Sequence, residues 1–185
     1  MRTGVLWLEA ATSQRRFGIK GPRAAEMLQR HGFNVPARPN TWSPLRTQDA
    51  DGSLNVVARL GNTEFFLEEQ GDGPSIAALE ESLSGVSGVS GVSGAWPVLR
   101  EDFAMVLGGV RALDALAEVC NVEFGALALE EKPVVMTLVT GVSVLVLPQR
   151  LDTPVYRIWC DPSFGSYLWE TLADVVATTT TGRGG

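Results

Sequence analysis

Short apolar runs bounded by polar residues recur along the first half of the chain. Runs of this kind are typical of strands, and they predict three, at residues 16–20, 55–60 and 64–68. The last two are separated by Gly61-Asn62-Thr63, which predicts a hairpin. A period of 3.6 residues begins at Gly21-Pro22, and a second helical stretch is predicted from about Ser75 to Leu83.

The second half repeats this order of elements. Strand-like apolar runs predict strands at residues 103–107, 142–147 and 155–160. A helix is predicted after Gly109, with Leu113, Leu116, Ala117 and Cys120 on one face. Asp161-Pro162 is a typical helix start, and it is followed by Phe164, Leu168, Leu172 and Val175 at helical spacing.

A shared motif links the two halves. Gly-x-Arg-Ala-x-acid-x-Leu runs from Gly21 to Leu28 and again from Gly109 to Leu116. Each half therefore reads strand, helix, strands, helix, which is typical of a split β-α-β, ferredoxin-like unit. We predict an α+β fold of two repeated units, residues 1–84 and 96–177, joined by a Gly-Val-Ser linker at 85–95 and followed by a flexible tail at 178–185.

Composition limits the class of protein. Hydrophobic residues make up 45% and charged residues 19% of the 185 residues, enough apolar surface to bury a core. The net charge of −6 argues against binding the phosphate backbone of a nucleic acid. The longest apolar stretch, residues 134–147, is too short and too interrupted to span a bilayer, so we expect a cytoplasmic location.

Residues that could carry chemistry are few. His31 is the only histidine and is predicted to end a helix, where it complements the dipole. Cys120 and Cys160 are expected to be reduced, buried thiols, and one histidine with two distant cysteines makes a zinc site improbable. Gly71-Asp72-Gly73 is interpreted as a turn, and the neighbouring carboxylates Glu68-Glu69, Glu80-Glu81 and Glu130-Glu131, like Arg15-Arg16, as solvated charge. We predict no catalytic, cofactor-binding or metal-binding residues in this chain.

Five tryptophans are the more informative feature. Trp42 and Trp96 lie beside prolines in stretches that resemble loops. Tryptophan is enriched at protein interfaces, which makes these two the candidate contact residues for a partner. The alternative, that they cover the core of a small domain, is equally open.

Several segments in order resemble one protein family. They are residues 16–25, 36–42 and 60–67 in the first half and 156–160 and 163–174 in the second. Together they resemble the gamma subunit of the heterotetrameric sarcosine oxidases over roughly residues 10–176. The resemblance implies a fold like that of aminomethyltransferase (T-protein).

The resemblance also implies partners and cofactors. In that family a beta subunit carries the flavin chemistry and an alpha subunit carries NAD and the tetrahydrofolate site. The complex converts sarcosine to glycine with peroxide and methylenetetrahydrofolate as products. The expected partners are thus alpha and beta subunits, with delta as a further candidate. FAD, FMN, NAD and tetrahydrofolate are expected in those partners and no cofactor in this chain.

Two other functions stay open. A free-standing folate-dependent aminomethyltransferase-like protein would need a carboxylate near the reacting nitrogen, for which Glu101 or Asp102 are the candidates. A binding module for another partner would share the expected interface. The Gly-Val-Ser repeat and Glu9-Ala10-Ala11-Thr12 depart from the family pattern, which leaves the N-methyl substrate of any complex open.

Overall fold

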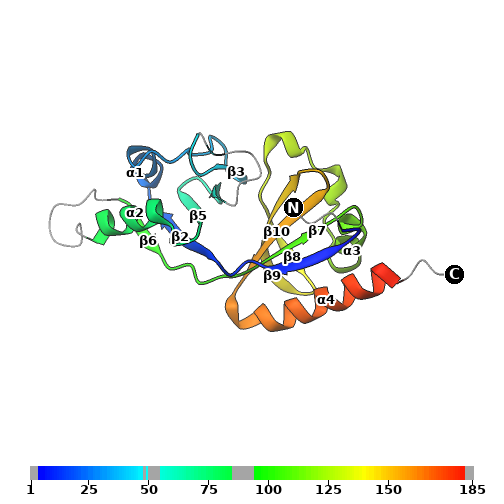
Figure 1. Ribbon diagram of the computed structural model, residues 1–185. Coiled ribbons are helices and arrows are strands. Elements are labelled where there is room, and N and C mark those ends of the chain that lie inside the picture. Colours follow the sequence, from blue (N-terminus) through cyan, green and yellow to red (C-terminus); the bar gives the residue numbers. More distant parts are fainter. Residues whose placement is uncertain (1–3, 48, 50–54, 85–93, 182–185) are drawn as a thin grey trace. The chain divides into compact units, whose positions relative to one another are not determined.

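The computed structural model describes residues 4–47, 49, 55–84 and 94–181 (Figure 1). The chain divides into two compact units, one of residues Ser13–Glu101 and one that combines Met1–Thr12 with Asp102–Gly185. We describe each unit by itself. Most of the predicted linker, residues 85–93, lies outside the described residues.

The unit of residues 13–101 has one antiparallel sheet with two helices. Its sheet has the order β3-β4-β5-β2-β6, and every neighbouring pair is antiparallel. Its elements in chain order are β2 (Gln14–Lys20), α1 (Ala24–Arg30), β3 (Thr41–Pro44), β4 (Val56–Arg59), β5 (Glu64–Gln70), α2 (Pro74–Ser84) and β6 (Trp96–Val98).

The other unit has the same architecture. Its antiparallel sheet has the order β1-β7-β10-β9-β8. Its elements are β1 (Trp7–Ala10), β7 (Phe103–Gly108), α3 (Ala112–Val119), β8 (Val135–Val139), β9 (Val142–Arg150), β10 (Pro154–Cys160) and α4 (Gly165–Thr181), with short 3-10 turns at Phe124–Ala126, Leu129–Glu131 and Pro162–Phe164. The predicted α+β class is confirmed, with two five-stranded antiparallel sheets.

The edge strands cross the predicted domain boundary. Strand β1, at the start of the chain, pairs with β7 of the later half, and β6, after residue 95, pairs with β2 of the first half. The observed units therefore differ from the predicted ranges 1–84 and 96–177. Each half of the chain contributes one edge strand to the sheet of the other half.

The shared sequence motif has the same backbone conformation in both units. Gly21 and Gly109 have φ values of 128° and 119°, a region that favours glycine. In each case the arginine two residues later is the N-cap of the helix, and its side chain bonds the acidic residue three positions on, Arg23 Nε to Glu26 Oε2 at 2.8 Å and Arg111 Nε to Asp114 Oδ2 at 3.0 Å. The helices begin at Ala24 and Ala112, three residues after the predicted glycine start.

One face of each sheet forms a core with the helices of its own unit. In the unit of residues 13–101, Phe17 and Ile19 of β2 and Phe65 and Leu67 of β5 are buried with α1 and α2. In the other unit Met105 and Leu107 of β7 and Tyr156 and Ile158 of β10 are buried with α3 and α4. Each fully buried side chain of this kind stabilises the fold by about 1.5–3 kcal/mol relative to an exposed one.

The far end of the chain differs from its prediction. Helix α4 continues to Thr181, so the loose tail predicted from residue 178 is wrong for residues 178–181, and residues 182–185 lie outside the described part. The predicted start at Asp161-Pro162 is that of the 3-10 turn Pro162–Phe164, where the Asp161 carboxylate accepts a hydrogen bond from the Ser163 N–H at 2.9 Å, and α4 itself begins three residues later, at Gly165. Among the described residues no helix is long and apolar enough to cross a membrane.

Candidate functional site

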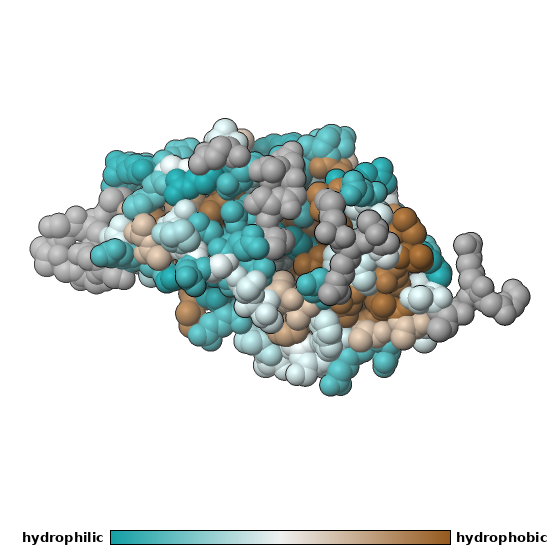
Figure 2. All heavy atoms as spheres, in the orientation of Figure 1, coloured by the Kyte–Doolittle hydropathy of each residue, from teal (hydrophilic) through white to brown (hydrophobic). Residues whose placement is uncertain are grey.

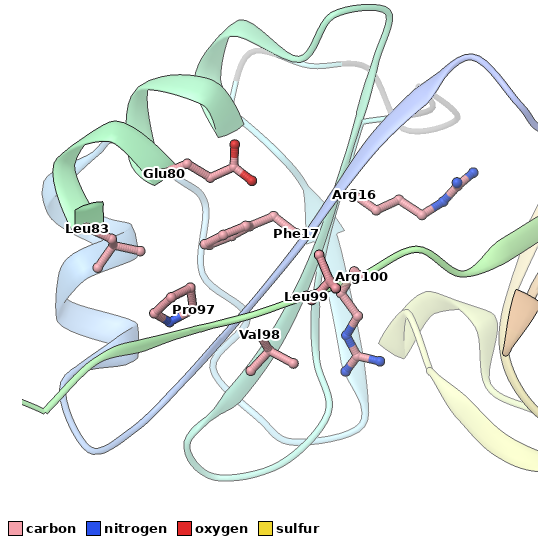
Figure 3. Close-up of a pocket in the computed structure, with 8 residues that line it drawn as sticks. All are labelled: Arg16, Phe17, Glu80, Leu83, Pro97, Val98, Leu99 and Arg100. Atoms are coloured by element: carbon pink, nitrogen blue, oxygen red, sulfur yellow. The ribbon is translucent and has the colours of Figure 1, made fainter. Parts of the chain in front are cut away.

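A pocket of about 540 Å³ lies in the unit of residues 13–101, between α2 and the edge strand β6 (Figure 3). Phe17 comes from β2, Leu83 from α2 and Pro97 from β6, and they supply apolar walls. Leu99, which follows β6, is 81% exposed at its rim. The remaining lining residues are Arg16, Glu80, Val98 and Arg100.

The charged residues at this pocket are held in pairs. Arg16 Nε lies 2.6 Å from Glu68 Oε2, and Arg100 lies 3.2 Å from Glu64. Glu80 forms an ion pair with Arg15 on β2. The pocket thus combines apolar walls with charges that are already compensated, which suits an apolar group better than an anion.

The carboxylates of β5 correct one prediction. Glu68 and Glu69 were expected to be solvated, but they are 0% and 7% exposed. Glu68 lies opposite Arg16 in the strand register, and Glu69 Oε2 accepts the N–H of Ile76 at 2.9 Å, which caps the first turn of α2. Both carboxylates therefore stabilise the fold.

The two predicted contact tryptophans lie in different environments. Trp96 is on β6 and is 53% exposed, so it presents aromatic surface next to the pocket residues Pro97 and Val98. Trp42 is 6% exposed and lies on β3, so the loop predicted for it is wrong and it offers little surface to a partner. Its burial agrees with the alternative of a core residue.

His31 is held as a structural residue. It is the C-terminal cap of α1, as predicted, and its Nε2 lies 3.1 Å from Ser82 Oγ. The Ser82 hydroxyl also donates to the Leu79 carbonyl at 2.7 Å, so its contact with His31 is anchored to α2.

Both cysteines are buried and free, in agreement with the prediction. Burial, together with the nearby charges of Asp102 and Asp161, raises the pKa of the Cys160 thiol to about 11. Cys120 Sγ lies 3.8 Å from Thr137 Oγ1. A raised thiol pKa disfavours the thiolate, so Cys160 is poorly suited to nucleophilic catalysis.

The other sequence candidates fall on turns and chain surfaces. Gly71 and Gly73 have φ values of 68° and 59° and form the turn between β5 and α2, as interpreted from the sequence. Glu101 is exposed and Asp102 partly buried. Within the described part of the chain, no group of three or more His, Cys, Asp or Glu residues is arranged to hold a metal ion.

Trp96 was the one residue of this region predicted as a contact residue, and the apolar walls around Phe17 and the exposed Leu99 were not predicted. The sequence signal for them is weak, because β6 has only three residues and includes Pro97. Pairing with β2 shows that the stretch is an edge strand, with Trp96 opposite Lys20 and Pro97 opposite Ile19.

Comparison with known proteins gives structural matches only. No protein-family model and no curated protein matches the chain. The structure is similar to a chain of heterotetrameric sarcosine oxidase from Corynebacterium sp. U-96, solved in complex with pyrrole 2-carboxylate, with a TM-score of 0.72, 18% identity, 95% of this chain and 86% of that chain covered.

It is also similar to glycine cleavage system aminomethyltransferase T from Bartonella henselae, with a TM-score of 0.64 and 17% identity. That match covers 92% of this chain but 46% of the aminomethyltransferase, so the chain spans about half of that enzyme. At these identities the likeness concerns the fold. The chain has the aminomethyltransferase-like fold that it shares with a chain of heterotetrameric sarcosine oxidase.

Proposed function

We propose that the chain is the non-catalytic gamma subunit of a heterotetrameric sarcosine oxidase-type flavoenzyme. In this proposal it stabilises an assembly that oxidatively demethylates sarcosine to glycine. The alpha and beta subunits, with delta as a further candidate, hold FAD, FMN, NAD and tetrahydrofolate.

The observation that carries this proposal is the matched length of the two similar chains. The sarcosine oxidase chain is covered over 86% of its length, whereas the aminomethyltransferase is covered over 46%. The residues of this chain thus have counterparts along most of the sarcosine oxidase chain, but along only about half of the aminomethyltransferase.

The surface around β6 supports a role in assembly. Trp96 and Leu99 are 53% and 81% exposed, beside a pocket with apolar walls. Aromatic and aliphatic side chains that stand next to an apolar pocket are typical of contact sites in protein interfaces. We propose that this surface, Trp96 together with the pocket, contacts a partner subunit.

Co-purification from the native host tests the proposal. The full chain is isolated through an affinity tag, and larger chains with the visible absorbance of a flavin are expected with it. Trp96→Ala should reduce their recovery, because central tryptophans of interfaces often contribute 2 kcal/mol or more, roughly 30-fold in affinity. Tyr167→Ala is the matched control, since Tyr167 is 52% exposed in the other unit.

The alternative is a free-standing folate-dependent aminomethyltransferase-like protein. A colourless chain that is isolated alone and binds tetrahydrofolate would favour this alternative. A lone chain that binds neither partner nor folate would contradict both functions.

We also infer that the two units are copies of one split β-α-β, ferredoxin-like unit with an added strand. The two sheets have corresponding strand orders, which supports this inference. The positive φ at Gly21 and Gly109, each followed two residues later by an arginine at the N-cap of a helix, supports it as well. In both units the arginine N–H bonds a carbonyl that precedes the edge strand, that of Gly94 for Arg23 and that of Val5 for Arg111.

A further inference from the structure

The two sheets have four edge strands, and three of them carry features that discourage pairing with another chain. Strand β3 ends at Pro44, β6 contains Pro97, and β1 contains the exposed Glu9. Prolines and charges on edge strands are common means of preventing unwanted pairing, because they remove a donor or oppose burial. Strand β8, with the sequence Val-Met-Thr-Leu-Val, has neither.

The sequence on both sides of β8 is uncharged as well. No Asp, Glu, Lys or Arg occurs between Lys132 and Arg150. Met136 and Leu138 are each 55% exposed, and Met136 lies opposite Leu145 on the same face of the sheet. Hydrophobic residues also gather in Figure 2 over the region where Figure 1 labels α3 and β7. Val110, between these two elements in the sequence, is 63% exposed. Among the described edge strands, β8 combines two exposed apolar side chains with a backbone edge that holds neither proline nor charge.

The turn fixes which backbone groups of β8 face outward. Thr140 and Gly141, with φ values of 50° and 85°, form a two-residue turn between the paired residues Val139 and Val142. Residues that flank such a turn form a hydrogen-bonded pair, and these pairs alternate along the ladder. Val135, Thr137 and Val139 therefore bond β9, while the N–H and C=O groups of Met136 and Leu138 point to the open edge.

We propose that the open edge of β8 pairs antiparallel with β8 of a second copy of this chain, centred on Thr137. In this register Met136 of one copy lies opposite Leu138 of the other, and the two residues exchange both backbone hydrogen bonds. The arrangement is its own complement under a two-fold axis, because the outward groups lie symmetrically on either side of Thr137. No charged residue of the segment 133–149 opposes it, and the exposed side chains meet as Met–Leu pairs on one face.

Oligomeric state against concentration is the first test. The purified full chain is examined by sedimentation and light scattering from about 5 µM to about 500 µM, because a small interface gives weak association. We expect a monomer–dimer equilibrium. Leu138→Lys should shift the midpoint upward by at least tenfold, and Val110→Lys, a charge added at another exposed apolar site, should leave it unchanged. Thermal unfolding of both variants verifies that they are folded.

Cysteine cross-linking tests the register. An equimolar mixture of Met136→Cys and Leu138→Cys chains should form a disulfide-linked heterodimer under mild oxidation. Each variant alone should not, because position 136 of one copy lies two residues along the strand from position 136 of the other. The same offset separates the two positions 138, and it places both pairs beyond disulfide reach. The native thiols are buried and do not compete.

A monomer at every concentration would overturn the proposal. So would a dimer that Leu138→Lys leaves intact, or a cross-link within one variant that is as strong as in the mixture. Binding of β8 to a strand of a different protein, with no self-association, would also overturn it. The proposal stands apart from the subunit role, since co-purification of flavin-containing partners is decided in a separate experiment.

Discussion

The ion pair between Arg16 and Glu68 gives the sharpest energetic prediction. The two residues lie opposite each other on β2 and β5, with Arg16 Nε 2.6 Å from Glu68 Oε2. Their side chains are 10% and 0% exposed. Removal of one partner from a buried pair is costly, because the other charge stays in a poorly solvating environment, whereas removal of both is often nearly neutral.

The two single substitutions should differ in size. Arg16→Met leaves the fully buried Glu68 carboxylate without the guanidinium beside it, and we expect a loss of about 3–5 kcal/mol in the free energy of unfolding. Glu68→Leu leaves Arg16, whose long side chain retains a route to water, so we expect about 2–3 kcal/mol. The double variant should lie within about 1 kcal/mol of the wild type, which gives a coupling of at least about 3 kcal/mol.

Urea unfolding of the wild type and the three variants, followed by tryptophan fluorescence, measures these free energies of unfolding. The four proteins are compared with the same slope of free energy against urea concentration. Glu64→Gln is the control, because Glu64 is 45% exposed in its pair with Arg100 and should cost less than about 1 kcal/mol. Additive losses in the double variant, or a loss below about 1 kcal/mol for Arg16→Met, would refute the reasoning.

Three further predictions concern other parts of the chain. Gly109→Ala should lower the free energy of unfolding in urea by about 2–4 kcal/mol, because its Cβ would lie 2.5 Å from the Val5 carbonyl oxygen at a φ of 119°. Gly61→Ala is the control and should cost under about 0.5 kcal/mol, because no atom lies within 4 Å of the added Cβ. Equal losses in the two variants would contradict the argument. Burial raises the pKa of Cys160 from 9.0 to about 11, so the stabilisation from its neutral thiol is present below pH 9 and is lost as the pH rises toward 11. Iodoacetamide should therefore modify Cys160 at least about 100-fold more slowly in the folded than in the unfolded chain. Equal rates would contradict the burial of this thiol. Arg59→Met should lose about 1–3 kcal/mol, because the guanidinium donates to the carbonyls of Pro36, Ala37, Gly61 and Asn62, and Arg59→Lys should recover only part of that stability if the fork geometry matters.

The sequence predicted elements with a strong local pattern. Strands at 64–68 and 155–160 and the helices after Arg23 and Arg111 were all identified, because short apolar runs, helical spacing and glycine turns act over a few residues. Strands β1, β3, β6 and β8 were missed. Three of them have only three or four residues, and β8 lies in the interrupted apolar stretch of residues 134–147, of which only 142–147 was predicted as a strand.

The exchange of edge strands was beyond local reasoning. A division at the Gly-Val-Ser repeat follows the order of the motifs, but β1 and β6 pair across that division. The reason is visible in the backbone: the Arg111 N–H bonds Val5 and the Arg23 N–H bonds Gly94, so each helix start is stabilised by a segment distant in sequence. No pattern within either half indicates such a long-range hydrogen bond.

The candidate site shows the same division between local and long-range information. Arg15, Arg16, Glu68 and Glu80 were interpreted as solvated charges, because their sequence gives no sign of pairing across β2, β5 and α2. Once paired, these charges no longer attract a charged ligand, and the available surface of the pocket is its apolar part. In the proposed subunit role, the exposed Trp96 favours a partner with an apolar contact surface. For this reason the loss expected from Trp96→Ala should persist at high salt, whereas a contact based on surface charge would weaken there.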